Sequence, residues 1–407
     1  MKKVLIAGSA LLLGLAACRS KTKTEQTVAG PPVGTFAYDQ VFLQNHHKDV
    51  VVLRDGDAQA LVLPAYQGRV MTSTADGKTS YGWINYDLIR SGKLLPHMNA
   101  FGGEDRFWMG PEGGQYAIFF KKGDAFTGDN WQTPAPIDSE PFTLVTSNER
   151  SARFSRNFQL TNYAGTAFNV GLEREVRLLS RPELAQLLEI PSADGLKMVG
   201  VQSNNTLINR GQEAWTPDKG LLSVWILGMF NASPRTTVIV PFRKGSGAVI
   251  NDSYFGKVPV DRLVLKDTVA YFKADAKLRS KIGVSPDGAK NWLGSYDPAT
   301  QTLTLVTYTF DPANRQYVNS MWEQQKNPYG GDVVNSYNDG PMKPGQPQMG
   351  QFYELETSSP AAALAPGNRL IHTHTTMHIQ GSEAQLAPIA QRLLGASLPA
   401  IQQVFSQ

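Results

Sequence analysis

Residues 302–310 read TLTLVTYTF, and this stretch decides the fold class. Apolar and polar side chains largely alternate along it, which is the pattern of a β-strand with one face against a core. Similar short apolar runs, broken by Gly, Pro, Asn and Asp, recur from Thr35 onward. The clearest of these runs are residues 50–53, 60–63, 116–120, 142–145, 168–172, 238–242 and 263–265. Runs of this length with turn residues between them predict an all-β sandwich or barrel.

Two stretches depart from the β pattern. Residues 181–188, RPELAQLL, predict one or two turns of helix. The C-terminal residues 382–407 predict a pair of helices, because Ser382 and Gln385 fit a capping box and Gly395 suits the end of the first helix. We therefore expect a short helical tail that packs over one end of a large β domain.

The N-terminus has the features of a bacterial lipoprotein signal peptide, residues 1–17. Two lysines precede an apolar segment, residues 4–15, which is too short to span a bilayer as a mature helix. The segment ends in Leu-Ala-Ala-Cys, which resembles a lipobox. The resemblance implies cleavage before Cys18 and lipid on its sulfur and its amine. Several acyl chains on one residue make a durable membrane anchor.

The rest of the chain is expected to divide into a flexible tether, residues 18–34, and one domain, residues 35–407. We expect this domain to be held at a membrane of the bacterial cell envelope. The formal net charge is +4 over 407 residues, and no long run of like charge is present. This balance argues against nucleic-acid binding. The motifs that bind nucleotide phosphates or form a nucleophile elbow are absent, and we predict no cofactor.

The most polar stretch is residues 95–120, LPHMNAFGGEDRFWMGPEGGQYAIFF. Charges and aromatic residues rarely crowd together in a core strand, and glycines allow a backbone to approach a ligand closely. The stretch therefore predicts a loop that aims acids, a guanidinium and an indole at one polar ligand, such as a sugar. The alternative is a buried Arg–carboxylate cluster that fixes a turn beneath a sheet.

A second polar stretch is residues 351–367, QFYELETSSPAAALAPG. In a strand, Glu354 and Glu356 share one face, while Tyr353 and Leu355 point the other way. Two like charges in a partly buried cleft raise at least one pKa, which suits a carboxylate to act as a general base. The alternative is a solvated strand face.

Three histidines follow at residues 372, 374 and 378, and in a strand all three lie on one face. Such a set could bind a metal ion through imidazole nitrogens, and one of the histidines could serve as a general acid. The alternative is a row of surface or hydrogen-bonded histidines beside the glutamate strand.

Residues 329–341, YGGDVVNSYNDGP, offer donors, acceptors and an aromatic ring for a sugar. Asn338 and Asp339 are the candidate contacts, although Asn-Asp-Gly by itself is typical of a turn. Tryptophans could supply stacking platforms or belong to the core, and those considered are Trp215, Trp225, Trp292 and Trp322.

Three stretches together resemble the galactose-mutarotase-like (aldose 1-epimerase) superfamily. Residues 64–70, PAYQGRV, are similar to its early G-x-R-[IV] strand, and residues 353–367 to its late strand with a glutamate, a proline-containing segment and an L-x-P-G turn. Residues 101–114, FGGEDRFWMGPEGG, look like an uncharacterised lipoprotein branch of it. The resemblance covers residues 36–381 and implies a β super-sandwich with a carbohydrate cleft on its concave sheet.

The resemblance also implies roles for residues, because a glutamate of this superfamily takes the anomeric proton and a histidine protonates the ring oxygen. By position, it implies Glu356 as the general base, with Glu354 second. His97 is the candidate acid, although it precedes the glycines by more residues than in the family pattern. Arg106 would orient hydroxyls and Trp108 would stack on a sugar face. The other candidate substrate contacts are Arg69, Asn99, Glu104, Glu112, Asn338, Asp339, His372 and His374.

Three functions remain open from the sequence. The first is a lipid-anchored carbohydrate-binding protein that interconverts sugar anomers by Glu/His acid–base catalysis. The second is a glycan-binding lipoprotein without catalysis. The third is a metal-binding protein that uses His372, His374 and His378.

Overall fold

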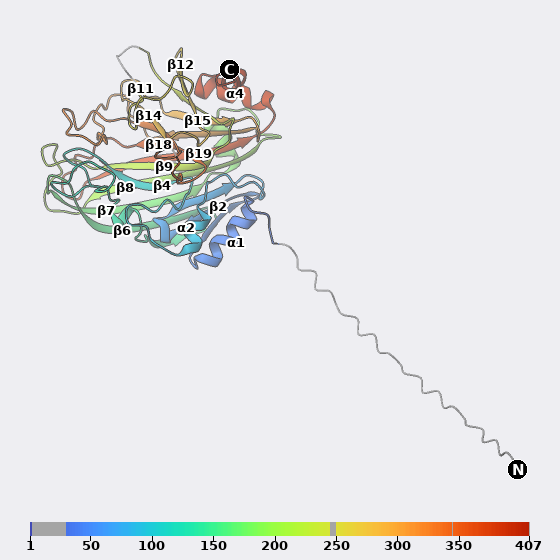
Figure 1. Ribbon diagram of the computed structural model, residues 1–407, viewed down its shortest axis with the longest axis horizontal. Coiled ribbons are helices and arrows are strands. Elements are labelled where there is room, and N and C mark those ends of the chain that lie inside the picture. Colours follow the sequence, from blue (N-terminus) through green and yellow to red (C-terminus); the bar gives the residue numbers. More distant parts are fainter. Residues whose placement is uncertain (2–29, 245–249, 344, 407) are drawn as a thin grey trace. The chain divides into compact units, whose positions relative to one another are not determined.

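Three antiparallel β-sheets dominate the computed structural model, which describes residue 1 and residues 30–244, 250–343 and 345–406 (Figure 1). The predicted all-β class with a short C-terminal helical tail is confirmed. By its contacts the chain divides into two units, Met1–Pro31 and Pro32–Gln407, and every helix and strand below belongs to the second. The expected signal peptide, Cys18 and the tether up to residue 29 lie outside the described residues.

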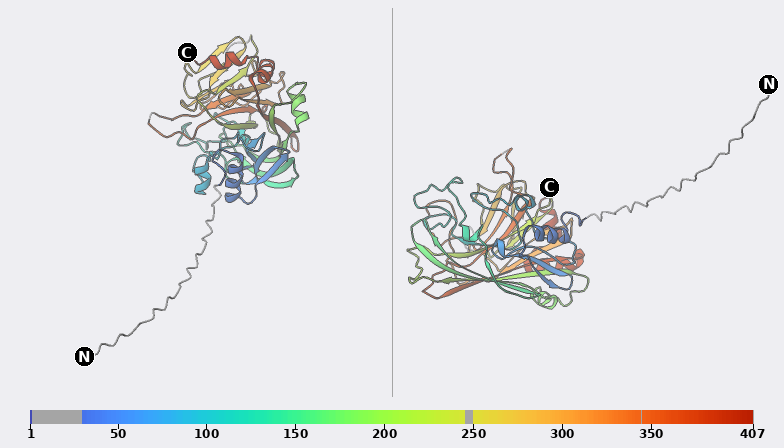
Figure 2. Two further views of the ribbon diagram at one scale, coloured as in Figure 1. Left: turned by 90° about the vertical axis from the view of Figure 1, so that its right-hand side faces the viewer. Right: turned by 90° about the horizontal axis from the view of Figure 1, so that it is seen from below.

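The largest sheet has ten strands, and its long members run side by side as one layer in the right-hand view of Figure 2. In spatial order the strands are β12 (Leu263–Lys266), β13 (Val269–Lys273), β10 (Thr237–Pro241), β15 (Trp292–Asp297), β16 (Thr302–Tyr308), β19 (Arg369–Gln380), β8 (Lys197–Asn209), β7 (Ala167–Leu178), β6 (Ser151–Thr161) and β5 (Thr143–Ser147). The alternating stretch that predicted the fold is β16, at the centre of this sheet.

The second sheet has six strands and carries the candidate site. In spatial order they are β11 (Ile250–Asn251), β14 (Ser280–Val284), β17 (Val334–Asn338), β18 (Phe352–Ser358), β9 (Ser223–Asn231) and β4 (Arg106–Gly110). The third sheet has three strands, β1 (Val51–Asp55), β2 (Ala58–Leu63) and β3 (Arg69–Thr74).

The core fills the space between the two large sheets. Phe272 and Val306 from the ten-stranded sheet pack with Ile282 and Leu355 from the six-stranded sheet, and all are fully buried. Burying each such side chain contributes roughly 1.5–3 kcal/mol. The packing explains why successive strand residues differ in character, since one face of each strand must be apolar.

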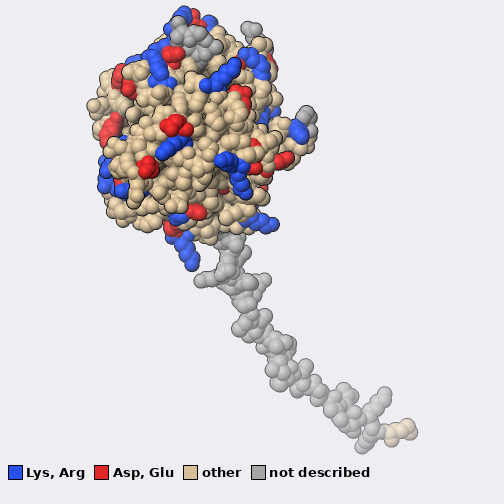
Figure 3. Space-filling view, turned by 90° about the vertical axis from the view of Figure 1, so that its left-hand side faces the viewer, with Lys and Arg blue, Asp and Glu red and all other residues tan. Residues whose placement is uncertain are grey.

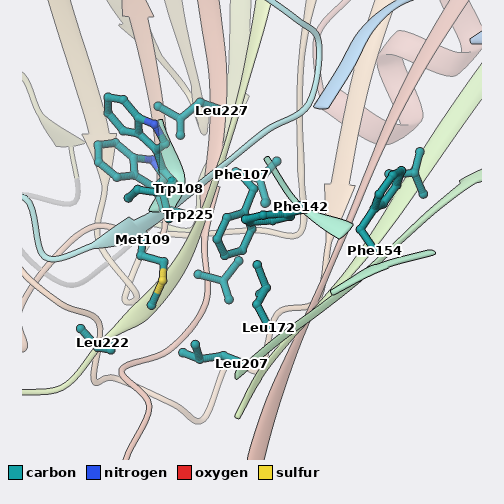
Figure 4. Packing of buried hydrophobic residues seen from close by; sticks show 14 of the residues in the cluster. Phe107, Trp108, Met109, Phe142, Phe154, Leu172, Leu207, Leu222, Trp225 and Leu227 are labelled. Atoms are coloured by element: carbon teal, nitrogen blue, oxygen red, sulfur yellow. The ribbon is translucent and has the colours of Figure 1, made fainter. Parts of the chain in front are cut away.

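A neighbouring part of the core lies behind β4. Figure 4 shows Phe107 against Phe142, and their ring centroids are 5.9 Å apart. Leu172 and Leu207 of the ten-stranded sheet belong to the same cluster. Phe107 therefore fixes β4 to the core, and its neighbours Arg106 and Trp108 face the other way.

Helices cover the outer face of the ten-stranded sheet. The predicted helix at residues 181–188 is α3 (Arg181–Leu187), and the predicted tail is α4 (Glu383–Leu394) and α5 (Leu398–Gln403). The capping box at Ser382 is present, and Gly395 ends α4 in a left-handed conformation. In α4, Leu386 and Ile389 pack with residues of β16 and β19.

Two helices were not predicted. They are α1 (Phe36–His46) and α2 (Tyr86–Ser91), which pack against the three-stranded sheet. The α1 N-terminus is capped by Thr35, whose side chain accepts a hydrogen bond from the Tyr38 N–H. The cap residue and the i, i+7 spacing of buried Phe36 and Leu43 were signals that the search for short apolar runs passed over. No described helix has both the length and the apolar character that crossing a membrane requires.

Two predictions about residues 95–120 were wrong in part. The stretch is not all loop, because Arg106–Gly110 forms β4, the edge strand paired with β9. Conversely, residues 116–120 do not form a strand, although Ile118 and Phe119 are buried in the core. Their backbone is held in turns, where Ala117 N–H bonds to the Gly114 carbonyl. An apolar run buried in a loop has the same pattern as a short strand.

Candidate functional site

The register of the six-stranded sheet brings charged side chains together in two adjacent rows on one face. The first row crosses four strands through Lys281, Tyr337, Glu354 and Met229. The second row crosses through Asn335, Glu356, Leu227 and Arg106. Directly opposed residues of paired strands lie on the same face, so these side chains are neighbours. The predicted shared face of Glu354 and Glu356 is thereby confirmed.

Two ion pairs connect these rows diagonally. Arg106 Nη2 lies 3.1 Å from Glu354 Oε1, and Lys281 Nζ lies 2.8 Å from Glu356 Oε2. Trp225 Nε1 donates a further hydrogen bond of 2.9 Å to Glu356 Oε2. All four charged side chains are less than one-tenth exposed. A buried charge must be paired, because its transfer from water is otherwise too costly.

A cavity of about 300 Å³ lies over this face, and we call it the sheet cavity. Its charged or titratable lining residues are His97, Arg106, Glu112, Arg279, Lys281, Asp339 and Glu354. Its aromatic lining residues are Trp108, Trp131, Trp225, Phe255, Trp322, Tyr337 and Phe352. Ligand sites of roughly 300–1,000 Å³ that combine apolar walls with a few polar groups are the usual form of a small-molecule site.

Four indoles form a connected wall of the sheet cavity. Trp108 lies edge-on to Trp225 with ring centroids 5.6 Å apart, and the two lie together in Figure 4. Trp131 stacks on Trp322 at 6.0 Å and lies 6.3 Å from Trp108. The Arg106 guanidinium carbon is 4.1 Å from the centre of the Trp108 ring. The wall offers a flat apolar surface beside hydrogen-bonding groups.

The carboxyl groups of the sheet cavity hold their protons more tightly than ordinary carboxyls. Burial raises the pKa of Glu354 to about 8; the nearby Arg106 opposes this effect and the charge of Glu356 adds to it. Burial also raises the pKa of Glu112 and that of Asp339. Near neutral pH, Glu354 can therefore donate a hydrogen bond as well as accept one.

The two glutamates differ in access to the sheet cavity. Glu354 is part of its lining, whereas Glu356 is fully buried behind Lys281 and Trp225. Oε1 of Glu356 has no hydrogen-bond partner among the described residues. The sequence ranked Glu356 first, but the geometry favours Glu354 as the group that meets a ligand.

His97 lies at the rim. It is exposed and contributes to the lining, and its Nδ1 is 2.6 Å from the Trp131 carbonyl oxygen. His97 thus holds the loop that carries Trp131, and its Nε2 is the nitrogen left for a ligand.

Arg69, Asn99 and Asn338 were expected to contact substrate, but the structure buries them away from the sheet cavity. Arg69 donates to the Gly102 carbonyl and to Gln67. Asn99 bonds to Asp138. Asn338 faces the opposite side of β17 from Asp339 and bonds to backbone groups. Each of these side chains fixes a loop or strand end, because a buried polar group needs an internal partner.

Glu104, His372 and His374 were also expected to bind substrate, and they belong instead to an interior polar cluster. The cluster comprises Glu104, Asp105, Arg174, Asn205, Thr357, His372, His374 and His378, all buried. Thr357 Oγ1 lies 2.9 Å from both His372 Nε2 and His374 Nδ1. Glu104 Oε2 lies 3.0 Å from His378 Nε2.

The interior polar cluster is held by Asp105 and Arg174, whose charged atoms are 2.6 Å apart. Burial lowers the pKa of His372 to about 3 and that of His374 to about 4, so both imidazoles are neutral at physiological pH. Both interpretations of residues 95–120 therefore apply, each to a different part. Glu104 and Asp105 belong to a buried Arg–carboxylate cluster, whereas Arg106, Trp108 and Glu112 line the cavity.

The metal-binding alternative finds no support in the geometry. The three histidines do share a face of β19, but His372 and His374 face a threonine and His378 faces Thr304 and Glu104. Within the described ranges, no three His, Cys, Asp or Glu side chains are placed to hold a metal ion.

Several residues of the sheet cavity were missed in the sequence. Lys281 and Arg279 had one available signal, because a lysine at the second position of the apolar strand SKIGV breaks the pattern of β14. Trp131 had none, since it lies in a loop far from the motifs. On the face shown in Figure 3, charges of both signs are interspersed and form no single-sign patch.

Together, the fold and the site define a β-sandwich protein with a small-molecule cavity on the face of its six-stranded sheet. The chain belongs to the family of unknown function DUF6786, whose sequence model matches residues 34–405. No curated protein matches the sequence.

Solved structures with a similar course of the chain include three bacterial proteins. A protein of Synechocystis sp. PCC 6803 is 11% identical, covers 82% of this chain and 96% of its own, and has a TM-score of 0.49. A galactose mutarotase-like protein from Lactobacillus casei is 10% identical, with coverages of 81% and 100% and a TM-score of 0.46. A galactose mutarotase related enzyme from Lactobacillus acidophilus is 9% identical, with coverages of 81% and 97% and a TM-score of 0.44. These include members of the superfamily that the sequence motifs resemble, and we infer no ligand from them.

Proposed function

We propose that this protein binds a carbohydrate in the sheet cavity. The observation that carries the proposal is the meeting of four indoles with the Arg106–Glu354 pair around one space of about 300 Å³. Sugar rings have apolar faces that stack on aromatic rings, and hydroxyls that pair with carboxyl and guanidinium groups. The motif resemblance to galactose-mutarotase-like proteins supports the same ligand class.

Binding can be tested by calorimetric titration of the full chain, purified in detergent, with D-glucose, D-galactose, D-mannose and D-xylose. We expect at least one to bind, and we expect Glu354→Gln to weaken binding up to about tenfold, because a hydrogen bond contributes roughly 0.5–1.5 kcal/mol. Glu213→Gln is the matched control, since Glu213 is 86% exposed. If no neutral or acidic sugar binds, or if both variants weaken binding equally, the proposal is wrong.

A second candidate function is anomer interconversion in the same cavity, favoured by the raised pKa of Glu354. Glu354 would give its proton to the ring oxygen, and Glu112, the other glutamate that lines the cavity, would take the proton of the anomeric hydroxyl. The ring would then open to the free aldehyde and reclose with either configuration, and the two protons would return. Glu354 thus takes the role that the resemblance gave to His97.

Anomer exchange can be followed by NMR of the anomeric proton with a sugar that binds. Catalysis by the wild type that is lost in both Glu354→Gln and Glu112→Gln supports this second function. Binding without exchange in the wild type leaves the protein as a carbohydrate binder.

We also propose that lipid on Cys18 anchors the domain to a membrane of the bacterial cell envelope. Support comes from the lipobox-like sequence, in which Cys18 is the only cysteine. We expect Cys18→Ala to lose radiolabelled fatty acid and to move from the membrane fraction to the soluble fraction. Ser20→Ala, two residues away, is the control and should stay in the membrane fraction. Retention of label in Cys18→Ala would contradict the anchor.

A further inference from the structure

Three cationic side chains line the sheet cavity, and one differs from the others. Arg106 and Lys281 each have a buried glutamate within 3.1 Å. Among the described residues, no carboxylate lies within 4.0 Å of the Arg279 guanidinium. A cation that faces a small-molecule cavity without an internal counter-charge is suited to a charged group of the ligand.

The Arg279 guanidinium is nevertheless held in a fixed position. Its central carbon lies 3.8 Å from the centre of the Phe255 ring, and its Nε donates a 3.3 Å hydrogen bond to Tyr337 Oη. Tyr337 in turn donates a 2.8 Å bond to Asp339 Oδ1. These contacts occupy one face and one edge of the guanidinium. Neither terminal nitrogen bonds to a described residue, so the fork is free for a planar acceptor.

The carboxyls around Arg279 do not cancel its charge. Burial raises the pKa of Glu354, Glu112 and Asp339, which reduces the negative charge of the cavity near neutral pH. The cavity therefore favours an anionic ligand over a neutral one.

We propose that the ligand is an acidic sugar, a uronic acid or a saccharide ending in one, whose carboxylate pairs with the two terminal nitrogens of Arg279. This inference rests on the proposed carbohydrate function and specifies its substrate class. A carboxylate fits the single free fork as a bidentate partner. A phosphate dianion is matched best by two cations with free donors, whereas Arg106 and Lys281 already donate to Glu354 and Glu356.

The test compares the binding of D-glucuronate, its methyl ester, D-glucose and glucose 6-phosphate to the full chain by calorimetric titration, with the galactose series in parallel. We expect a uronate to bind at least tenfold more tightly than its ester and its parent sugar. Arg279→Gln should abolish this preference, and Arg279→Lys should keep part of it, because a lysine retains the charge but not the fork. Thermal unfolding confirms that each variant is folded.

Arg315→Gln is the matched control, since Arg315 is half exposed and pairs with Asp287 on the surface. It should keep the full preference. Equal binding of the uronate and its parent sugar overturns the acidic-sugar inference and leaves the carbohydrate function intact. Tighter binding of the phosphate overturns the carboxylate assignment. If none of these sugars binds, both this inference and the proposed function fail.

Discussion

The chain turns from one kind of polar environment to another within three residues. Glu104 and Asp105 point into the interior polar cluster, where Asp105 pairs with Arg174 and Glu104 with His378. Arg106, Trp108 and Glu112 line the sheet cavity. Both regions are rich in charge, but the second borders the larger space, a cavity of about 300 Å³, whereas His378 of the first borders one of about 110 Å³.

The two regions have similar residue types, and they differ in whether the charged side chains have partners within the protein. In the interior polar cluster Asp105 pairs with Arg174 and Glu104 contacts His378, and His372 and His374 are neutral. The sheet cavity keeps a carboxyl with a raised pKa in Glu354 and a cation without a counter-ion in Arg279. A titratable group with a shifted pKa beside a cavity is a candidate for contact with a ligand.

The largest effect that distinguishes the regions is expected for Asp105→Ala. Removing Asp105 leaves the fully buried Arg174 without its ion-pair partner, which destabilises a protein by about 3–5 kcal/mol. Urea unfolding measures this loss. Asp87→Ala, in a surface pair with Arg90, is the control and should change stability by no more than about 0.5 kcal/mol. If Asp105→Ala lowers the free energy of unfolding by less than about 1 kcal/mol, the interior polar cluster does not depend on its ion pair and the contrast with the sheet cavity fails.

A comparable effect is expected for the pH dependence of stability through Glu354. Because its folded-state pKa is raised to about 8, the folded protein holds a proton that the unfolded chain releases above about pH 4.5. The contribution of the Glu354 proton to the free energy of unfolding is fully present below that pH and is lost as the pH rises to about 8. Since each pKa unit is worth about 1.4 kcal/mol, the shift of Glu354 corresponds to a fall of roughly 5 kcal/mol in the free energy of unfolding over this pH range.

Glu354→Gln should therefore flatten the fall in unfolding free energy between pH 5 and pH 8, as measured by urea unfolding at several pH values. Glu213→Gln, at an exposed position, should keep the wild-type slope. An identical slope in Glu354→Gln and the wild type would show that Glu354 is ionised in the folded state.

An effect of about 1–2 kcal/mol is expected for Thr357→Val. The substitution keeps the shape of the side chain but removes the hydroxyl that both His372 and His374 contact, and it leaves buried imidazole nitrogens without a partner. Thr143→Val, on the exposed edge strand β5, is the control and should be nearly neutral. Ligand binding by folded Thr357→Val should be unchanged, which calorimetry can check.

The smallest effect is expected for His97→Ala. His97 is exposed at the rim, so its loss should change sugar binding by no more than about twofold, in line with surface substitutions of up to about 0.5 kcal/mol. Calorimetry measures this change. A hundredfold loss of anomer exchange, with binding retained, would instead restore His97 as the general acid.

The sequence predicted the fold class well because the relevant signals are local. The alternation in β16, the capping box at Ser382 and the glycine after α4 each depend on neighbours in the chain. The same holds for the face shared by Glu354 and Glu356. Local patterns could not assign the strands to sheets of ten, six and three, because that partition depends on contacts between distant segments.

The site was predicted less completely for the same physical reason. Glu104 meets a histidine 274 residues away, and Arg174 meets Asp105 across 69 residues. A polar residue in a polar stretch has the same local pattern whether its partner is a ligand or a distant side chain. Of the substrate contacts expected in this stretch, Arg106, Trp108 and Glu112 line the sheet cavity, whereas Glu104 and Asn99 beside them do not.

The indole wall has a consequence for how ligand binding can be observed. Four of the seven tryptophans of the chain line the sheet cavity, with ring separations of 5.6–6.3 Å between neighbours. At such separations, excitation energy passes readily between indoles, and their transitions couple in circular dichroism. The intrinsic tryptophan fluorescence of the protein therefore reports mainly on this cavity. A ligand that displaces water from the indole wall should shift the emission wavelength without any added label.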